Sequence, residues 1–335
     1  MLWLMALVLL FAQVREQIVV ERILVDARVT DDMGDPILGL TAADFIVKID
    51  GKLAKVESVD WIPETAAQRE IAGIDEVPPA PATDVPAPKG RLFIYFFQTD
   101  FARNASRVGG QMSFFTYADQ MVDDLESGDR VCVFSFDSHL KFRLDFTDDK
   151  RALKDTIRQS LLIDEPPPPP IVPNPSVARR LDREQMKNCK SSDEAFILVA
   201  NAVRGIPGPK SMILFGWGLG RLSGGAVVMD RKYPIARYAL ETSRVTVFAV
   251  DTTEADWHSL EVGLAKAAGD TGGYYSRAFR FPQLVVNRLQ KTLVGHYELE
   301  VRKPQIERRG THTIEVEVNK RGAIVLARST YVDTD

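Results

Sequence analysis

The sequence predicts an α/β protein in which a doubly wound, mostly parallel six-stranded sheet is inserted in a discontinuous antiparallel β-sandwich. Three observations lead to this fold class. Strand-like and helical segments alternate over residues 91–294. Segments with strand alternation and no helical period precede them at 17–62 and follow them at 295–333. A proline-rich stretch at 63–90 reads as a linker between the first β segment and the alternating region.

Composition excludes several classes of protein. With 335 residues the chain suits one large domain and a smaller one. A net charge of −4 argues against a nucleic-acid partner, because such proteins gather basic residues over a wide surface. The two cysteines, Cys132 and Cys189, do not make a disulfide framework, although a single bridge between them is an alternative. Cys132 lies in a strand-like run and is expected to be a buried hydrophobic residue.

The first residues read as a targeting segment. "MLWLMALVLLFA" is uncharged and shorter than the ~20 apolar residues that span a bilayer. It has the length of a signal-peptide core, so residues 1–13 are predicted to be a signal-peptide-like segment, although the usual basic residues are missing. A buried strand or helix start is the alternative. We expect a secreted, periplasmic or cell-envelope protein that contacts the membrane only through this segment, if it stays uncleaved.

The two β segments are predicted to share one core. In the first, "VVERILVDARVT" reads as a strand, and the hairpin signal Asp50-Gly51 joins two more. In the second, "YELEVRK", "HTIEVEVN" and "IVLARSTYV" alternate in the same way. Neither segment has enough strands to bury a core alone, but together they supply about six or seven, the size of a sandwich.

The alternating region begins with an apolar run from Leu92 to Phe97, which predicts a buried strand. Residues 129–146 form two strands around the short turn Asp137-Ser138-His139, which requires an antiparallel pair. The other expected elements follow in order: a helix with Met112, Phe115, Ala118, Val122 and Leu125 on one face before that pair; a helix after Thr147; a helix opening at the capping-box pair Ser191 and Glu194; a strand at 211–217; a helix through Ile235 and Ala239; a strand at 244–251; a helix carrying Trp257, Leu260, Leu264 and Ala268; a strand at 274–277; and a helix with Val285, Leu289 and Leu293.

Common catalytic and cofactor motifs are missing. The first strand of the alternating region is not followed by G-x-G-x-x-G, and the chain contains no P-loop, H-E-x-x-H, C-x-x-C or G-x-S-x-G. We therefore expect no small-molecule cofactor and no enzyme activity. The four histidines are scattered and are expected to be ordinary residues rather than metal ligands: His139, His258, His296 and His312.

Several segments together resemble one family. They are "VDARVTDDMGDPILGLTAADFIVKIDG", "VTVFAVD" followed by "LAKAAGDTGGYYSRA", and the closing "GHYELEVRK…HTIEVEVN…IVLARSTYV". In combination they resemble the von Willebrand factor A (vWA) family, and more narrowly the VWFA-related proteins secreted by bacteria. The likeness covers nearly the whole chain.

The resemblance implies a metal site, which this sequence matches poorly. Family members hold Mg²⁺ or Mn²⁺ with D-x-S-x-S after the first strand, a threonine before a middle helix, and an aspartate after a later strand. Here the D-x-S-x-S positions carry Gln98, Asp100 and Ala102, and Trp217 replaces the later aspartate. The threonine position falls near Ser191 or Ser192. The resemblance therefore implies a degenerate metal site, with no Mg²⁺ or Mn²⁺ expected and Asp100 as the weak candidate ligand. Asp100 has two other roles open to it: capping the next helix or pairing with a basic residue.

The predicted function is a secreted or envelope protein-binding module that mediates protein–protein interaction or adhesion. Trp217 lies in the glycine-rich "FGWGLGRLSGG", where it either forms a recognition surface or packs inward to fill the metal cavity. Asp251 either lines the rim of the sheet or caps its loop. The run Pro166–Pro170 is either a ligand for an aromatic groove or a solvated spacer. The binding-rim candidates are Gln98, Asp100, Asn104, Ser191, Ser192, Trp217, Gly218 and Asp251.

Two other functions stay open. The first is a structural envelope protein that associates with itself through exposed sheet edges. The second is a hydrolase in which Asp100, Ser191 and Asp251 approach each other at the top of the sheet, although no histidine or lysine in a matching position suggests itself.

Overall fold

The computed structural model describes residues 21–73, 90–170, 172, 175–306 and 309–333. The signal-peptide-like segment at 1–13 and most of the proline-rich stretch lie outside these residues, so both interpretations stay predictions. Among the helices in the described part, none is long and apolar enough to cross a membrane.

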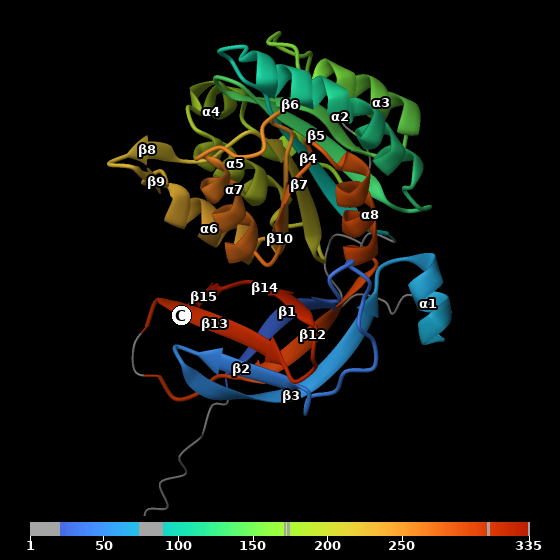
Figure 1. Ribbon diagram of the computed structural model, residues 1–335, viewed down its shortest axis with the longest axis vertical. Coiled ribbons are helices and arrows are strands. Elements are labelled where there is room, and N and C mark those ends of the chain that lie inside the picture. Colours follow the sequence, from blue (N-terminus) through green and yellow to red (C-terminus); the bar gives the residue numbers. More distant parts are fainter. Residues whose placement is uncertain (1–20, 74–89, 171, 173–174, 307–308, 334–335) are drawn as a thin grey trace, which may run out of the picture.

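A six-stranded sheet forms the centre of the alternating region (Figure 1). Its strand order is β11-β10-β7-β4-β5-β6, with β6 antiparallel to β5 and all other neighbours parallel. The strands are β4 (Leu92–Gln98), β5 (Arg130–Phe136), β6 (Leu140–Thr147), β7 (Lys210–Gly216), β10 (Val245–Asp251) and β11 (Tyr275–Arg277). Chain order reverses between β4 and β7, and open α/β sheets bind ligands beyond the carboxyl ends of the strands at such a point. The predicted mixed α/β architecture with six strands is therefore present.

Helices cover both faces of this sheet because its strands are apolar on both sides. Phe93, Tyr95 and Phe97 of β4 contact one core, and Ile94 and Phe96 contact the other. The first core is closed by α2 (Ala105–Asp123), α3 (Lys150–Gln159) and α8 (Pro282–Thr292). The second is closed by α5 (Ser192–Val203), α6 (Tyr233–Thr242) and α7 (Glu261–Asp270).

Strands from the two ends of the chain form a second, antiparallel sheet (Figure 1). Its order is β14-β1-β12-β3-β2-β13-β15. The strands are β1 (Arg22–Thr30), β2 (Phe45–Ile49), β3 (Lys52–Pro63), β12 (Gly295–Arg302), β13 (Thr311–Val318), β14 (Ile324–Ala327) and β15 (Thr330–Val332). We call it the curled sheet, because its edge strands β14 and β15 are consecutive in the chain and joined only by Arg328 and Ser329.

The curled sheet differs from the predicted sandwich. One sheet wraps around one core, which includes Val25, Phe45 and Tyr297, whereas a sandwich needs two facing sheets. A register shift between Glu300 and Val301 marks a bulge where β12 pairs with β3. Bulges bend strands and increase their twist, which favours a closed shape. The expected pairing of amino- and carboxyl-terminal β segments is present, since β12 lies between β1 and β3.

Several short elements were not predicted. Helix α1 (Ala66–Ala72) lies in the segment expected to be an extended linker, with Thr65 as its N-cap. A 3₁₀ turn (Ala178–Arg180) and α4 (Arg183–Asn188) precede α5. Strands β8 (Arg221–Ser223) and β9 (Ala226–Val228) form a projecting hairpin (Figure 1). All are too short for a periodic pattern to show in the sequence.

Two expected helix faces are present except for one residue in each, since Ala118 and Val122 of α2 and Leu264 and Ala268 of α7 are buried as predicted. Met112 of α2 is 58% exposed, and Phe114 and Met121 are buried instead. Gly110 explains this orientation, because a Cβ atom there would collide with the carbonyl oxygen of Thr252 and the glycine therefore lies against that backbone. Trp257 is 69% exposed and precedes α7, so it is not part of the buried helix face we expected.

The expectation for the cysteines is confirmed. Cys132 is completely buried in β5, and it and Cys189 are both free thiols. Burial raises the pKa of Cys189 to about 12, which keeps this thiol protonated and unreactive at neutral pH.

The amino-terminal edge of the six-stranded sheet faces the curled sheet (Figure 1). Arg244, next to the start of β10, donates to Asp26 of β1, with Nη2 2.8 Å from Oδ1. Thr330 of β15 donates to Glu241 of α6 at 2.5 Å. The carboxyl-terminal edge, where the binding candidates follow the strands, is therefore at the end of the molecule away from the curled sheet.

Candidate functional site

Gln98 is the centre of the carboxyl-terminal edge. Its Nε2 donates to Ser192 Oγ (3.2 Å) and to the carbonyl oxygen of Gly218 (2.7 Å). Its Oε1 accepts from the backbone N–H groups of Trp217 (3.0 Å) and Gly218 (3.2 Å). All four hydrogen-bonding positions of the amide are used. Gln98 therefore joins β4, α5 and the loop after β7, at the switch point of the sheet.

Asp100 holds the turn that leads into α2, and it also faces a cation. Its Oδ2 accepts from the N–H of Asn104 (2.8 Å) and its Oδ1 from that of Ala102 (3.2 Å). The guanidinium of Arg107 lies 3.5 Å from Oδ1. Asn104 is exposed and accepts from Ser106 as the N-cap of α2. Of the two roles considered for Asp100, the pairing with a basic residue is present, whereas Asn104 is the helix cap and Asp100 instead holds the turn before it.

Arg107 also covers Trp217. Its Cζ lies 3.8 Å from the centroid of the indole ring, which is a cation–π contact. Trp217 is half-buried, and its Nε1 is buried without a hydrogen-bond partner among the described residues. The backbone of Gly218 has φ +153° and packs against Leu260. The indole therefore packs inward, and a cationic side chain lies over it.

The start of α5 contributes polar groups beneath the same edge. Ser191 is the N-cap of α5 and accepts from the N–H of Glu194 at 3.2 Å. Ser192 is buried against Gln98. Asp193, which the sequence reasoning missed, is also buried, and burial with the nearby charge of Asp230 raises its pKa to about 6. A polar residue in the first turn of a helix gives no sequence signal of such burial.

These donors do not fit Mg²⁺ or Mn²⁺. Hard divalent cations take about six oxygen ligands in near-octahedral geometry. The amide oxygen of Gln98 already accepts two N–H groups, and the carboxylate of Asp100 accepts two N–H groups and faces Arg107. Trp217 offers no oxygen from its side chain. Arg107 provides a fixed positive charge between the two positions where the family resemblance implies metal ligands.

Asp251 caps its own loop. It is fully buried and accepts from the N–H of Thr253 at 2.9 Å. Its Oδ2 lies 2.6 Å from His258 Nε2 and 2.9 Å from the hydroxyl of Tyr275. Asp251, His258 and Glu261 are residue types that hold metals, and their ligand atoms lie within 4.8 Å of one another. However, the hydroxyl of Tyr275 donates to Asp251, and Arg277 donates to Glu261 at 2.7 Å, so both carboxylates already have protein partners.

Large apolar side chains are exposed above this buried framework. Three of them follow the carboxyl ends of β4, β10 and β11, and a fourth lies in β8 of the hairpin after β7. The fifth lies in the loop after α3, next to Ser160, whose carbonyl oxygen accepts from Thr99 at 2.7 Å. We call this set the apolar rim: Phe101 (59% exposed), Leu162 (49%), Leu222 (59%), Trp257 (69%) and Phe279 (41%). The sequence reasoning missed the rim, although the available signal was an isolated large apolar residue in a polar loop, as in "TDFARN" and "EADWHS".

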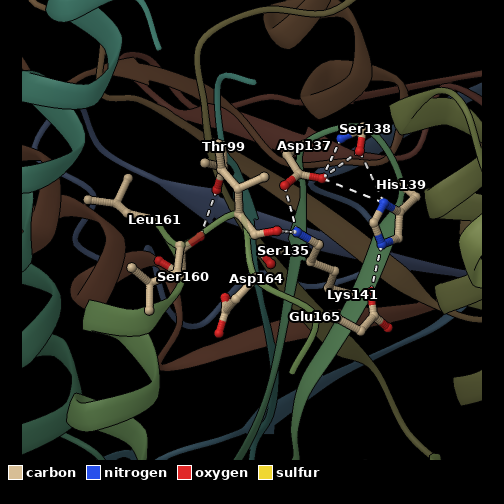
Figure 2. A network of polar contacts seen from close by, with 12 residues as sticks. Thr99, Ser135, Asp137, Ser138, His139, Lys141, Ser160, Leu161, Asp164 and Glu165 are labelled. Atoms are coloured by element: carbon tan, nitrogen blue, oxygen red, sulfur yellow. Dashed lines mark hydrogen bonds and ion pairs between the residues drawn. The ribbon is translucent and has the colours of Figure 1, made fainter. Parts of the chain in front are cut away.

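The loop after α3 is held firmly by the β5–β6 hairpin (Figure 2). Lys141 donates to the carbonyl oxygen of Ile163 (2.7 Å) and pairs with Asp137 (2.6 Å), and both side chains are buried. Figure 2 shows Glu165 beside His139, and the Nε2 atom of His139 lies 3.0 Å from the Oε2 atom of Glu165. Arg143 of β6 donates to the carbonyl oxygen of Leu162 at 2.6 Å.

The proline run starts directly after this anchor. Every residue before a proline is restricted to extended backbone, so Glu165–Pro169 cannot form a helix. Pro167, Pro168 and Pro170 are exposed, and Pro166 and Pro169 are partly buried. A spacing of three matches the polyproline II helix. The run is a stiff segment beside the apolar rim, tied down at its first end.

No family model matches the chain, and no curated protein matches it. Similar solved structures include the conserved hypothetical protein BatB from Bacteroides thetaiotaomicron, which is 14% identical with a TM-score of 0.42, covering 61% of this chain and 98% of that chain. A von Willebrand factor type A protein from Catenulispora acidiphila is 8% identical over 92% of this chain and 72% of its own, with a TM-score of 0.41. An aerotolerance-related membrane protein from Bacteroides fragilis is 12% identical, with a TM-score of 0.39, and the match covers 61% of this chain and 96% of that chain. The likeness concerns the α/β fold alone.

Proposed function

We propose that the protein is a protein-binding module that uses the apolar rim without a metal ion. The observation that carries this proposal is that the loops at one edge of the six-stranded sheet expose large apolar side chains, including Phe101 and Trp257. Exposed apolar groups gathered at one end of a soluble domain mark interaction sites. Aromatic side chains also contribute most to the affinity of protein interfaces.

The buried network explains how the rim keeps its shape. Gln98 fixes the loop after β7, and Asp100 fixes the loop before α2 that carries Phe101. Lys141 fixes the loop that carries Leu162. A preorganised surface binds more tightly because less conformational entropy is lost on association. In this proposal the sequence candidates support the binding surface from below, and the exposed apolar residues contact the partner.

Site-specific crosslinking tests the proposal. A photoreactive benzophenone residue in place of Trp257 should give a discrete adduct with one partner in an extract of the source cells. The same probe in place of Leu53, which is 73% exposed on β3, is the matched control and should not give that adduct. With the partner identified, Phe101→Ser should weaken its binding roughly tenfold or more, whereas Leu53→Ser should leave it unchanged.

Equal adducts from both probe positions would contradict the proposal, because they would show non-specific apolar contact. Self-association is the alternative that the same variants address. If sedimentation velocity shows concentration-dependent oligomers that Trp257→Ser abolishes, the partner is a second copy of the chain.

Hydrolysis is the other alternative. Asp100, Ser191 and Asp251 each cap a helix or loop, which leaves them no obvious place in a converging catalytic group. The turn of the β5–β6 hairpin and the loop after α3 together hold a serine–histidine–carboxylate chain. Ser138 Oγ lies 3.1 Å from His139 Nδ1, and the other ring nitrogen, Nε2, lies 3.0 Å from Glu165 Oε2. An esterase activity lost in Ser138→Ala would support this alternative against the binding function.

A further inference from the structure

A large cavity lies between the six-stranded sheet and the curled sheet, at the opposite end from the apolar rim. Its volume is about 1340 Å³, and its walls come from β1, the ends of β12 and β15, the end of α6 and the start of β10. We call it the junction cavity. It is large enough for a small organic ligand, because such sites typically occupy ~300–1000 Å³.

The junction cavity concentrates positive charge. Seven arginine or lysine residues line it, against four aspartate or glutamate residues, in a chain whose net charge is −4. Several of these cations are already paired: Arg244 with Asp26, and Lys303 with Asp333 at 2.6 Å. An excess of cations in a partly enclosed space attracts anions, because low-dielectric walls focus the field.

Arg328 lines this cavity and forms no ion pair with a carboxylate of the described residues. It lies in the two-residue link between β14 and β15, and its Nη2 donates to the carbonyl oxygen of Leu24 at 2.8 Å. Its Nε is buried and has no hydrogen-bond partner among the described residues. Burial lowers the pKa of Arg328, because nearby charges compensate only part of the lost hydration. Bidentate carboxylate or phosphate binding would satisfy such a guanidinium.

Two further donors in the same walls lack partners. Tyr331 is only 6% exposed, and its buried hydroxyl makes no hydrogen bond to any described residue. Arg28 is 4% exposed and pairs with Glu64 through Nη2, but its Nε is also unpartnered within the described ranges. Buried polar groups without partners cost free energy, so a native protein normally supplies a partner for them. An oxyanion ligand would be such a partner.

We propose that the junction cavity binds a small molecule that carries an oxyanion, either a carboxylate or a phosphate, and that Arg328 and Tyr331 are its recognition residues. This site is independent of the apolar rim and of the protein-binding function proposed above. The apolar residues Ile23, Val245 and Val332 in the same walls would contact the remainder of an organic ligand.

Calorimetric titration of the full chain tests this site. Citrate and inorganic phosphate, each at constant ionic strength, are the probes, so that a carboxylate and a phosphate source are compared. We expect saturable binding of one or both to a single site. Tyr331→Phe should weaken that binding several-fold while leaving the thermal midpoint the same or higher, since its hydroxyl has no protein partner to lose. Arg328→Gln should weaken binding roughly tenfold or more, because a charge-assisted contact is lost.

Arg321→Gln is the matched control, because Arg321 is exposed in a turn of the curled sheet and does not line the cavity. It should bind as the wild type does. Binding that is lost equally in Arg321→Gln would show general charge screening and overturn the proposal. Absence of saturable binding by both probes in the folded wild type would also overturn it. If Arg328→Gln fails to fold, Tyr331→Phe still decides the question.

Discussion

At the scale of single residues, charge at the carboxyl-terminal edge is balanced within the chain. Gln98 uses a neutral amide to join three segments, and Arg107 faces the carboxylate of Asp100. A carboxylate at position 98 would face the carbonyl oxygen of Gly218, which needs a donor. The amide is therefore a structural requirement of this edge, and its chemistry suits a framework better than a metal site.

Gln98→Glu should destabilise the protein by ~2–3 kcal/mol at pH 8, because a buried acceptor would replace a donor to Gly218 and leave a charge without a partner. Burial would raise the pKa of the new carboxyl above its unfolded value of ~4.3. The loss should therefore be small below pH 4 and grow as pH rises through the folded pKa. Urea unfolding at pH 4 and pH 8 measures this. The exposed Gln159→Glu is the control and should change stability little at either pH. Equal losses at the two pH values would contradict the argument.

Glu241 gives a second prediction at this scale. Burial raises its pKa to about 7, against the weaker opposing effects of Thr330 and Arg237. The native state therefore keeps a proton that the unfolded state releases near pH 4.5, so stability should fall as pH rises from 4.5 to 7. Glu241→Gln should remove this fall and stabilise the protein by ~1–3 kcal/mol at pH 8, with little effect at pH 4. Thermal midpoints over this range test it, and parallel profiles for the two proteins would refute it.

At the scale of elements, the sequence predicted the buried strands from their apolar runs, but it did not predict which side chains are exposed in the loops. The run from Leu92 to Phe97 predicted β4, and all of its residues are buried, because a strand covered on both faces needs no alternation. The orientation of α2 depends on the contact of Gly110 with Thr252, which lies far away in the sequence. The exposure of Phe101 and Trp257 likewise depends on which loops meet in space, so composition and period could not reveal the rim.

The loop that follows α3 yields an element-scale prediction. Lys141→Met should leave Asp137 as an uncompensated buried charge and cost ~3–5 kcal/mol. It should also free the loop at Ile163, so thermolysin should cleave near Leu162 faster than in the wild type. The double variant Asp137→Asn with Lys141→Met removes the unpaired charge and should recover part of the stability but not the protection from cleavage. Cleavage at the wild-type rate in both variants would show that Lys141 does not anchor the loop.

At the scale of the whole molecule, the sequence predicted that the two ends of the chain share a sheet, because neither β segment could bury a core alone. It did not predict that this sheet curls, with a bulge at Glu300 and a short link at Arg328 between its two edge strands. The curl brings the edge strands β14 and β15 to either side of a two-residue link, which leaves less room for a second chain to pair with these edges. It also places Arg328 at the wall of the junction cavity.

The two sheets meet around a buried ionic group whose strength can be measured. Glu64 at the end of β3 pairs with Arg28 (3.0 Å) and with His296 (2.6 Å), and Arg28 lies 5.7 Å from the ring centroid of Phe248 in β10. Burial alone would raise the pKa of Glu64, but the charges of Arg28 and His296 lower it to about 2. Because this folded pKa is below the unfolded value of 4.5, the ionised carboxylate of Glu64 stabilises the protein fully above pH 4.5, and that stability is lost as pH falls toward 2.

Glu64→Gln should therefore cost ~3–5 kcal/mol at pH 7, since Arg28 would stay buried without a carboxylate. The difference from the wild type should shrink in urea unfolding curves as pH is lowered toward 2. A loss that is the same at pH 7 and near pH 2 would mean that the lost shape of the side chain, rather than its charge, causes the effect.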